Sequence, residues 1–195
     1  MLQKIYFLVH ALHALFHGVP GSLVREGDVQ FMKVKQITGL LDRMFPLSLQ
    51  EDYDNAGMQV CFPDREVSGI LLALDIGLPT VDEAAGLNCQ LIVTHHPLLF
   101  KPVRKIIAGE LKSDIIISLM EHRISLYSAH TNLDKACYRT LGEALGLPAG
   151  EVLIETGPTG ENQVSGFGML SVLPQPLPLA TILSLVRERL KLEFI

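Results

Sequence analysis

Cysteine, positive charge and long apolar runs are all scarce in this chain, and each scarcity argues against a class of protein. The cysteines Cys61, Cys89 and Cys137 lie far apart and form no C-x-x-C pair, which predicts reduced thiols and a cytoplasmic location. The 16 Lys and Arg residues against 21 Asp and Glu give a formal net charge of −5, which argues against general nucleic-acid binding. No apolar stretch reaches the ~18 residues of a membrane-spanning helix, so we expect no membrane partner.

Several nucleotide-binding and hydrolase signatures are also missing. The chain contains no phosphate-binding P-loop, no G-x-G-x-x-G and no G-x-S-x-G motif. With 48% hydrophobic and 19% charged residues, the sequence predicts a packed core rather than disorder. Residues 1–31 precede Met32, where a more ordinary domain start begins, so we expect them to be an extension outside the folded unit.

Segments with the spacing of helices and strands alternate through the middle of the chain. Helices are predicted at 34–45, 79–87, 111–122 and 133–145, and strands at 68–76, 90–94 and 124–129. Such alternation predicts an α/β fold with a mainly parallel sheet and flanking helices.

We predict that this α/β metal-site domain extends over residues 32–156. A turn or linker at 156–160 would separate it from residues 157–195, read as the start of a second lobe. Further strands are predicted at 152–155 and 164–173, and an amphipathic helix at 179–192.

Potential metal ligands follow two of the predicted strands. His95 and His96 come directly after an apolar run that Pro97 must end, and His130 and Asp134 follow the next strand. Because ligands bind beyond the carboxyl ends of parallel strands, we expect these side chains, with Asp75, at one edge of the sheet. Two imidazoles and a carboxylate are ligand chemistry for a divalent metal.

Simpler roles remain open for several of these residues. His130 and Asp134 also suit a helix N-terminus, where Asp is a favoured cap. The stretch 52–57 reads as a plain turn. Lys101, Arg104 and Lys105 suit either a phosphate group or a solvated loop.

Four segments together resemble the Nif-three-like family, whose members are labelled GTP cyclohydrolase I type 2-like or YbgI-type dinuclear metal centre proteins. The segments are Y-D-N-A-G-M-Q-V at 53–60, G-I-L-L-A-L-D at 69–75, L-I-V-T-H-H-P-L-L-F at 91–100 and S-A-H-T-N-L-D at 128–134. The resemblance covers about residues 32–192 and implies a Nif-three-like α/β fold.

The resemblance also implies two divalent metal ions per subunit and a toroidal homo-hexamer. By resemblance His95, His96 and Asp134 are metal ligands, with His130 and Asn55 behind the ligands or in the cleft. Mixed nitrogen and oxygen ligands suit Zn, Fe, Mn or Ni.

The function implied is that of a divalent-metal-dependent hydrolase acting on a nucleotide-like small molecule, by opening the guanine ring of GTP. Family members carry a further histidine and glutamate near their C-terminus that do not occur in this chain. We therefore expect an N-terminal portion with an incomplete dinuclear site, weak or single metal occupancy and little turnover. The alternatives are a non-catalytic metal-binding oligomeric scaffold, a regulatory interaction protein, or a truncated product without function.

Overall fold

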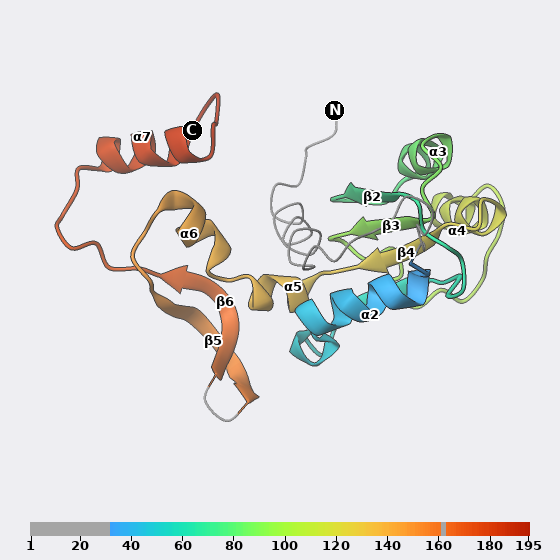
Figure 1. Ribbon diagram of the computed structural model, residues 1–195, viewed down its shortest axis with the longest axis horizontal. Coiled ribbons are helices and arrows are strands. Elements are labelled where there is room, and N and C mark those ends of the chain that lie inside the picture. The colour runs from blue at the N-terminus through green and yellow to red at the C-terminus, as the bar shows by residue number, and fades with distance from the viewer. Residues whose placement is uncertain (1–31, 161–162) are drawn as a thin grey trace, which may run out of the picture. The chain divides into compact units, whose positions relative to one another are not determined.

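The computed structural model describes residues 32–160 and 163–195, which form two compact units (Figure 1). The first unit runs up to Asn132 and the second from Leu133 to Ile195. The extension predicted at residues 1–31 lies outside the described residues. The domain boundaries predicted from the sequence stay predictions.

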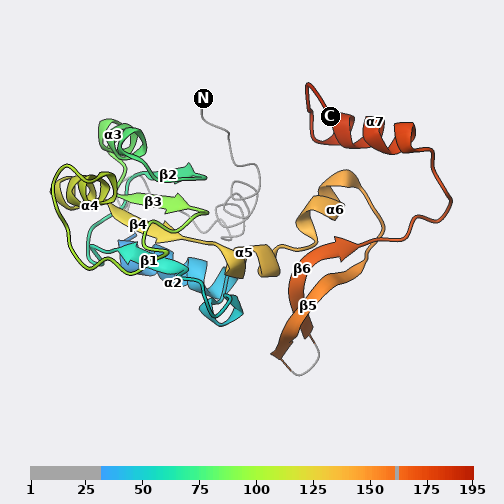
Figure 2. The same cartoon turned by 180° about the vertical axis from the view of Figure 1, so that it is seen from behind.

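A four-stranded mixed sheet forms the centre of the first unit. Its strand order is β1-β4-β3-β2, in which β2, β3 and β4 are parallel and β1 is antiparallel to β4 (Figures 1 and 2). The predicted α/β fold with a mainly parallel sheet is therefore confirmed. The strands are β1 (Gly57–Val60), β2 (Ile70–Ala73), β3 (Leu91–Thr94) and β4 (Ser125–Ser128).

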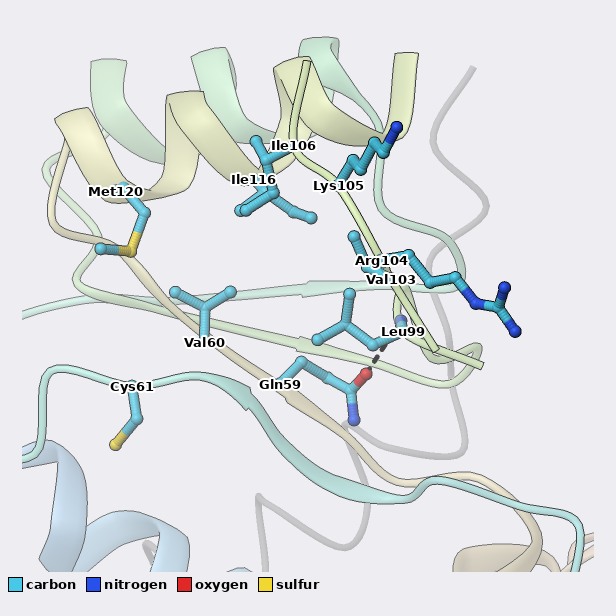
Figure 3. Close-up of a pocket in the computed structure, with 10 residues that line it drawn as sticks. All are labelled: Gln59, Val60, Cys61, Leu99, Val103, Arg104, Lys105, Ile106, Ile116 and Met120. Carbon is cyan, nitrogen blue, oxygen red and sulfur yellow. Dashed lines mark hydrogen bonds between the residues drawn. The ribbon is translucent and has the colours of Figure 1, made fainter. Parts of the chain in front are cut away.

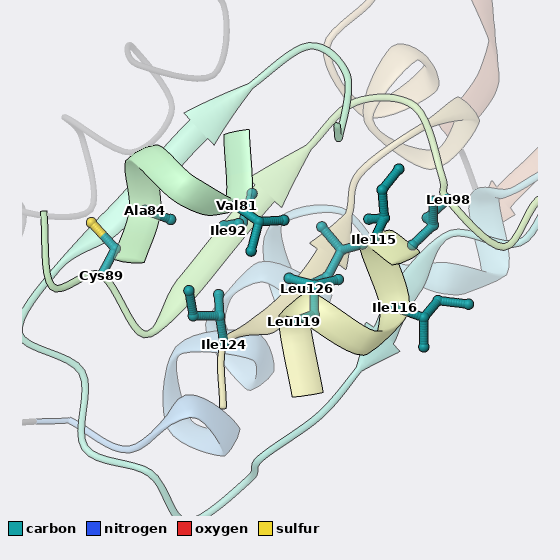
Figure 4. Packing of buried hydrophobic residues seen from close by; sticks show 10 residues of the cluster. All are labelled: Val81, Ala84, Cys89, Ile92, Leu98, Ile115, Ile116, Leu119, Ile124 and Leu126. Atoms are coloured by element: carbon teal, nitrogen blue, oxygen red, sulfur yellow. The ribbon is translucent and has the colours of Figure 1, made fainter. Parts of the chain in front are cut away.

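Helices α3 (Leu78–Gly86) and α4 (Leu111–Glu121) pack on one face of this sheet (Figure 4). Ile92 of β3 and Leu126 of β4 are fully buried against them. Both central strands are buried along their whole length, which explains why β3 reads as a largely apolar run. This packing holds the carboxyl ends of β3 and β4 side by side.

Helix α2 (Val34–Met44) packs on the opposite face. Successive strand residues point to opposite sides, so Tyr127 points away from its neighbour Leu126. Its hydroxyl donates a 2.8 Å hydrogen bond to Asp42 of α2. Burial, together with that bond, raises the pKa of Tyr127 far above its ordinary value. A short 3-10 helix, η1 (Leu47–Leu49), follows α2.

Gly57 begins β1 with φ of +93°, a conformation that L residues rarely adopt. A Cβ there would also stand 3.1 Å from a methyl group of Leu47. We expect Gly57→Ala to lower the free energy of unfolding by about 1–3 kcal/mol, measured by urea denaturation. The matched control is Gly86→Ala, because Gly86 has open space around its Cβ position and no unusual φ. Equal stability of the two variants would contradict this prediction.

The second unit contains a long antiparallel hairpin and two helices. The hairpin consists of β5 (Glu151–Gly160) and β6 (Gln163–Leu170). The helices are α6 (Thr140–Leu145) and α7 (Leu179–Arg189), and α5 (Thr131–Ala136) connects the two units in the sequence. Within this unit Lys135 is buried, with its ammonium 5.3 Å from the Phe167 ring centroid.

Two local predictions were wrong, and one strand was missed. The linker predicted at 156–160 is the end of β5, where the glycines and proline continue the strand with irregular register. The single helix predicted at 133–145 is divided into α5 and α6, since Cys137 and Tyr138 at the division are weak helix formers. Strand β1 was not predicted at all. Among the described residues, none of the helices has the length and apolar character needed to cross a bilayer.

Candidate metal centre

Three imidazoles meet at the carboxyl ends of the central strands. His95 and His96 follow β3, and His130 follows β4. One ring nitrogen from each lies within 4.8 Å of those of the others, and this is the only such group among the described His, Cys, Asp and Glu side chains. The ring centroids of the neighbours His95 and His96 are 5.0 Å apart, because the turn after β3 brings both rings to the same side.

Both histidines of the β3 turn are oriented through Nδ1. The Nδ1 atom of His95 lies 2.9 Å from the carbonyl oxygen of Ala129, and that of His96 lies 2.7 Å from a carboxylate oxygen of Asp75, which follows β2. A carbonyl or carboxylate oxygen accepts, so Nδ1–H donates in each case. In the neutral rings the lone pair is then on Nε2, the arrangement that metal-binding histidines commonly have.

His130 is oriented in the same way by a buried carboxylate. Its Nδ1 lies 2.9 Å from Oδ1 of Asp54, whose side chain is 0% exposed. Asp54 also accepts hydrogen bonds from the backbone N–H and hydroxyl of Thr131, and from the backbone N–H of Asn55. This carboxylate therefore connects the loop before β1 to the chain that leaves β4.

The ionised form of Asp54 is stabilised despite its burial. Burial by itself raises the pKa of this carboxyl group. The hydrogen bonds from Thr131, His130 and the Asn55 backbone have the opposite effect and together outweigh it, so the pKa of Asp54 lies below its ordinary value. A negative charge held at this position favours an imidazole that donates from Nδ1.

Asn132 fixes the backbone of this region. Its side-chain oxygen accepts from the N–H of His130 at 2.9 Å, and its Nδ2 donates to the carbonyl of Phe45 at 2.8 Å. Asn132 is fully buried. Asn132 thereby attaches the end of β4 to the end of α2 and bonds the backbone of His130 to the core.

Each residue singled out in the sequence has a defined place. The predicted convergence of His95, His96 and His130 at one edge of the sheet is observed. Asp134 lies on α5 in the second unit, and its role as a ligand stays a prediction. Asn55 is exposed and donates from Nδ2 to the carbonyl of Leu99 at 2.9 Å, so it holds the loop that follows the histidines.

Sequence reasoning missed Asp54, which the structure places directly behind the cluster. The Asp-Tyr-Asp-Asn-Ala-Gly stretch reads as a turn, and Asp54 does form part of a loop. Its partner His130 lies 76 residues further along the chain. The available signal was that Asp54 stands within the first segment of the family resemblance.

Two aromatic rings lie beside the imidazoles. The ring of Phe100 is 6.1 Å from that of His130, nearly perpendicular to it, and 6.3 Å from the ring of Tyr53. Both aromatic side chains are exposed. They give the imidazole cluster a partly apolar border.

The family model described as Duf34/NIF3 (NGG1p interacting factor 3) matches residues 32–195. The chain belongs to this family. The Duf34/NIF3 assignment confirms the resemblance predicted from the four sequence segments. It also agrees with the position of those segments, since they supply the three histidines, Asp54 and Asp75.

Curated relatives within the Duf34/NIF3 family carry the name GTP cyclohydrolase 1 type 2 homolog. The chain is 33% identical to the one from Clostridium acetobutylicum over 165 residues, which cover 83% of this chain and 61% of the relative. The match to the one from Streptomyces coelicolor is 34% identical and covers 81% of this chain and 56% of the relative. The chain thus spans about three fifths of the length of these relatives.

Solved structures share the Duf34/NIF3 fold. A Staphylococcus aureus protein superposes with a TM-score of 0.69 at 25% identity, covering 83% of this chain and 66% of that one. A Bacillus cereus protein related to NIF3 gives a TM-score of 0.61 at 35% identity, covering 66% of this chain and 36% of that one. Reduced HcgD from Methanocaldococcus jannaschii gives a TM-score of 0.59 at 34% identity, covering 65% of this chain and 52% of that one.

The hydrogen bond from His130 to Asp54 leads to a testable prediction about metal binding. We expect Asp54→Asn to weaken zinc binding by about 10- to 100-fold, because partners that orient ligating histidines contribute about this much. Competition with a chromophoric chelator measures the change. The exposed Asp52→Asn is the matched control and should bind zinc as the unchanged protein does. Unchanged affinity in a folded Asp54→Asn variant would show that His130 does not take part.

Proposed function

We propose that this chain carries a divalent-metal site of a hydrolase of the GTP cyclohydrolase I type 2-like kind. The observation that supports the proposal best is the cluster of three imidazoles, each with Nδ1 bonded to an oxygen acceptor. A purely structural role would not require ring nitrogens of three histidines to converge at one edge of the sheet. The names of the relatives support the reaction class.

The proposed ligands are His95, His96 and Asp134, with His95 and His96 on different ions of a dinuclear centre. The position of His130 in the same cluster adds it as a further candidate ligand. The donor set agrees with Zn, Fe, Mn or Ni. When bound, the ions would supply Lewis-acid chemistry, which activates water and orients substrate oxygens.

The protein's own groups would fix this site and border it. Asp54, Asp75 and the Ala129 carbonyl hold the rings in position, and Asn55 holds the following loop through Leu99. The exposed rings of Phe100 and Tyr53 offer an apolar surface for the planar base of a nucleotide-like substrate. We keep the homo-hexamer and the cytoplasmic location as predictions, and the three free cysteines agree with the predicted location.

The test of the hydrolase proposal separates metal binding from turnover. Purified protein is loaded with Zn, Fe, Mn or Ni, its metal content is measured, and GTP is added while the guanine absorbance is followed. We expect a slow, metal-dependent loss of guanine absorbance that is absent in the His95→Ala/His96→Ala double variant. Metal bound at the cluster without any change in GTP would contradict the hydrolase proposal and favour the non-catalytic alternative.

The measured metal content tests a separate expectation. Two tightly held ions per chain would contradict the expectation of weak or single occupancy.

The alternative is a non-catalytic metal-binding scaffold or regulatory interaction protein. The family description, which names an interacting factor, is the observation that favours it. Under this alternative the His95→Ala/His96→Ala variant keeps its oligomeric mass and its partners, whereas an enzyme loses activity. Sedimentation of both forms measures the assembly.

A further inference from the structure

A second concave site lies on the first unit, built by different residues from those of the imidazole cluster. It is a cavity of about 440 Å³ between the edge strand β1, helix α4 and the loop that follows His96. Figure 3 shows Ile116 and Met120 of α4 above Val60 of β1, with Leu99 and Val103 of the loop at the side. This volume is within the range of small-molecule sites, about 300–1,000 Å³.

The wall of the cavity is fixed by hydrogen bonds. The side-chain oxygen of Gln59 accepts from the Leu99 N–H at 3.0 Å, as the dashed line in Figure 3 marks. The amide nitrogen of Gln59 donates to the carbonyl of Asn55 at 2.7 Å. The loop is therefore attached to β1 without a ligand, which reduces the cost of ordering on binding.

Two basic residues line this cavity, although the protein has a negative net charge. Arg104 and Lys105 line it and are exposed, and neither forms an ion pair with any residue of the described ranges. The chain as a whole has a formal net charge of −5. An apolar floor with two basic residues at its rim, neither ion-paired within the described ranges, is complementary to a molecule with an apolar body and an anionic head.

We propose that this cavity binds a small amphipathic anion, of the class of a medium-chain carboxylate. The apolar chain lies against Val60, Ile116 and Met120, and the carboxylate lies near Arg104 and Lys105. The site is separate from the proposed metal chemistry, since none of its lining residues is a candidate ligand. Its test needs no metal, so the two proposals can fail independently.

The experiment measures decanoate binding by calorimetry, below the concentration at which it forms micelles. Decanol and decyltrimethylammonium are the comparison ligands, with the same chain and a neutral or positive head. We expect decanoate to bind tightest and to lose affinity with added salt. Arg104→Gln/Lys105→Gln should weaken decanoate about five- to tenfold and leave decanol unchanged. Lys112→Gln removes an exposed charge outside the cavity and is the control.

Two further measurements locate the ligand. Cys61 lines the cavity and is exposed, so decanoate should slow its labelling by a maleimide, with Cys61→Ser identifying that thiol. Met120→Glu places a like charge at an exposed cavity position and should abolish decanoate binding while the protein stays folded. Unaltered labelling of Cys61, or decanoate binding that the double variant retains, would overturn the proposal. Binding to anionic phospholipid vesicles without decanoate binding would overturn it too, and would assign the surface to a membrane.

Discussion

Replacing His95 by alanine is expected to weaken binding of the first divalent ion by more than about 100-fold. Loss of a ligating imidazole should exceed the 10- to 100-fold effect of losing a partner that only orients one. The ring of His95 is 5.0 Å from that of His96 and 5.1 Å from that of His130, so its removal opens the centre of the cluster. Competition with a chromophoric chelator, for zinc and manganese in turn, measures the loss.

The control for this prediction is His122→Ala. His122 is exposed at the end of α4, where its Nδ1 bonds only the Ser118 carbonyl of the preceding turn. It has the same residue type but no place in the cluster. Metal affinity that falls equally in both variants would indicate general, site-independent binding to histidines and contradict the assignment.

Replacing Asn132 by alanine is expected to lower the free energy of unfolding by about 2–4 kcal/mol. The change removes two hydrogen bonds and leaves the His130 N–H and the buried Phe45 carbonyl without their partner. Urea denaturation of the metal-free protein measures it, so that metal binding does not contribute to the difference.

Asn55→Ala is the control for this second prediction. It removes an exposed side-chain bond to Leu99, for which we expect a loss below about 1 kcal/mol. If Asn132→Ala cost no more than Asn55→Ala, the end of β4 would not depend on Asn132. The positioning of His130 would then need another explanation.

The part of the site that the sequence predicted depends on local pattern and sheet geometry. His95 and His130 each follow a run of buried residues, and the carboxyl ends of parallel neighbours meet at one edge. That reasoning needs no knowledge of contacts across the chain. It was therefore sufficient to predict that the three histidines lie close together.

The parts that were missed depend on contacts across long separations or on weak local signals. Asp54 acts through His130, 76 residues away, and its own surroundings read only as a turn. Strand β1 is short and obtains its place from antiparallel pairing with β4. In β5, Gly157 and Pro158 are ordinary turn residues, yet pairing with β6 continues through them.

The most direct test of the central claim is to locate the metal itself. Crystals grown or soaked with zinc would be measured at the zinc absorption edge, and the anomalous difference map calculated. We expect a peak about 2.0–2.1 Å from a ring nitrogen of His95 or of His96, at the carboxyl ends of β3 and β4. A zinc-loaded crystal with its only peaks elsewhere, or with none at these histidines, would contradict the account.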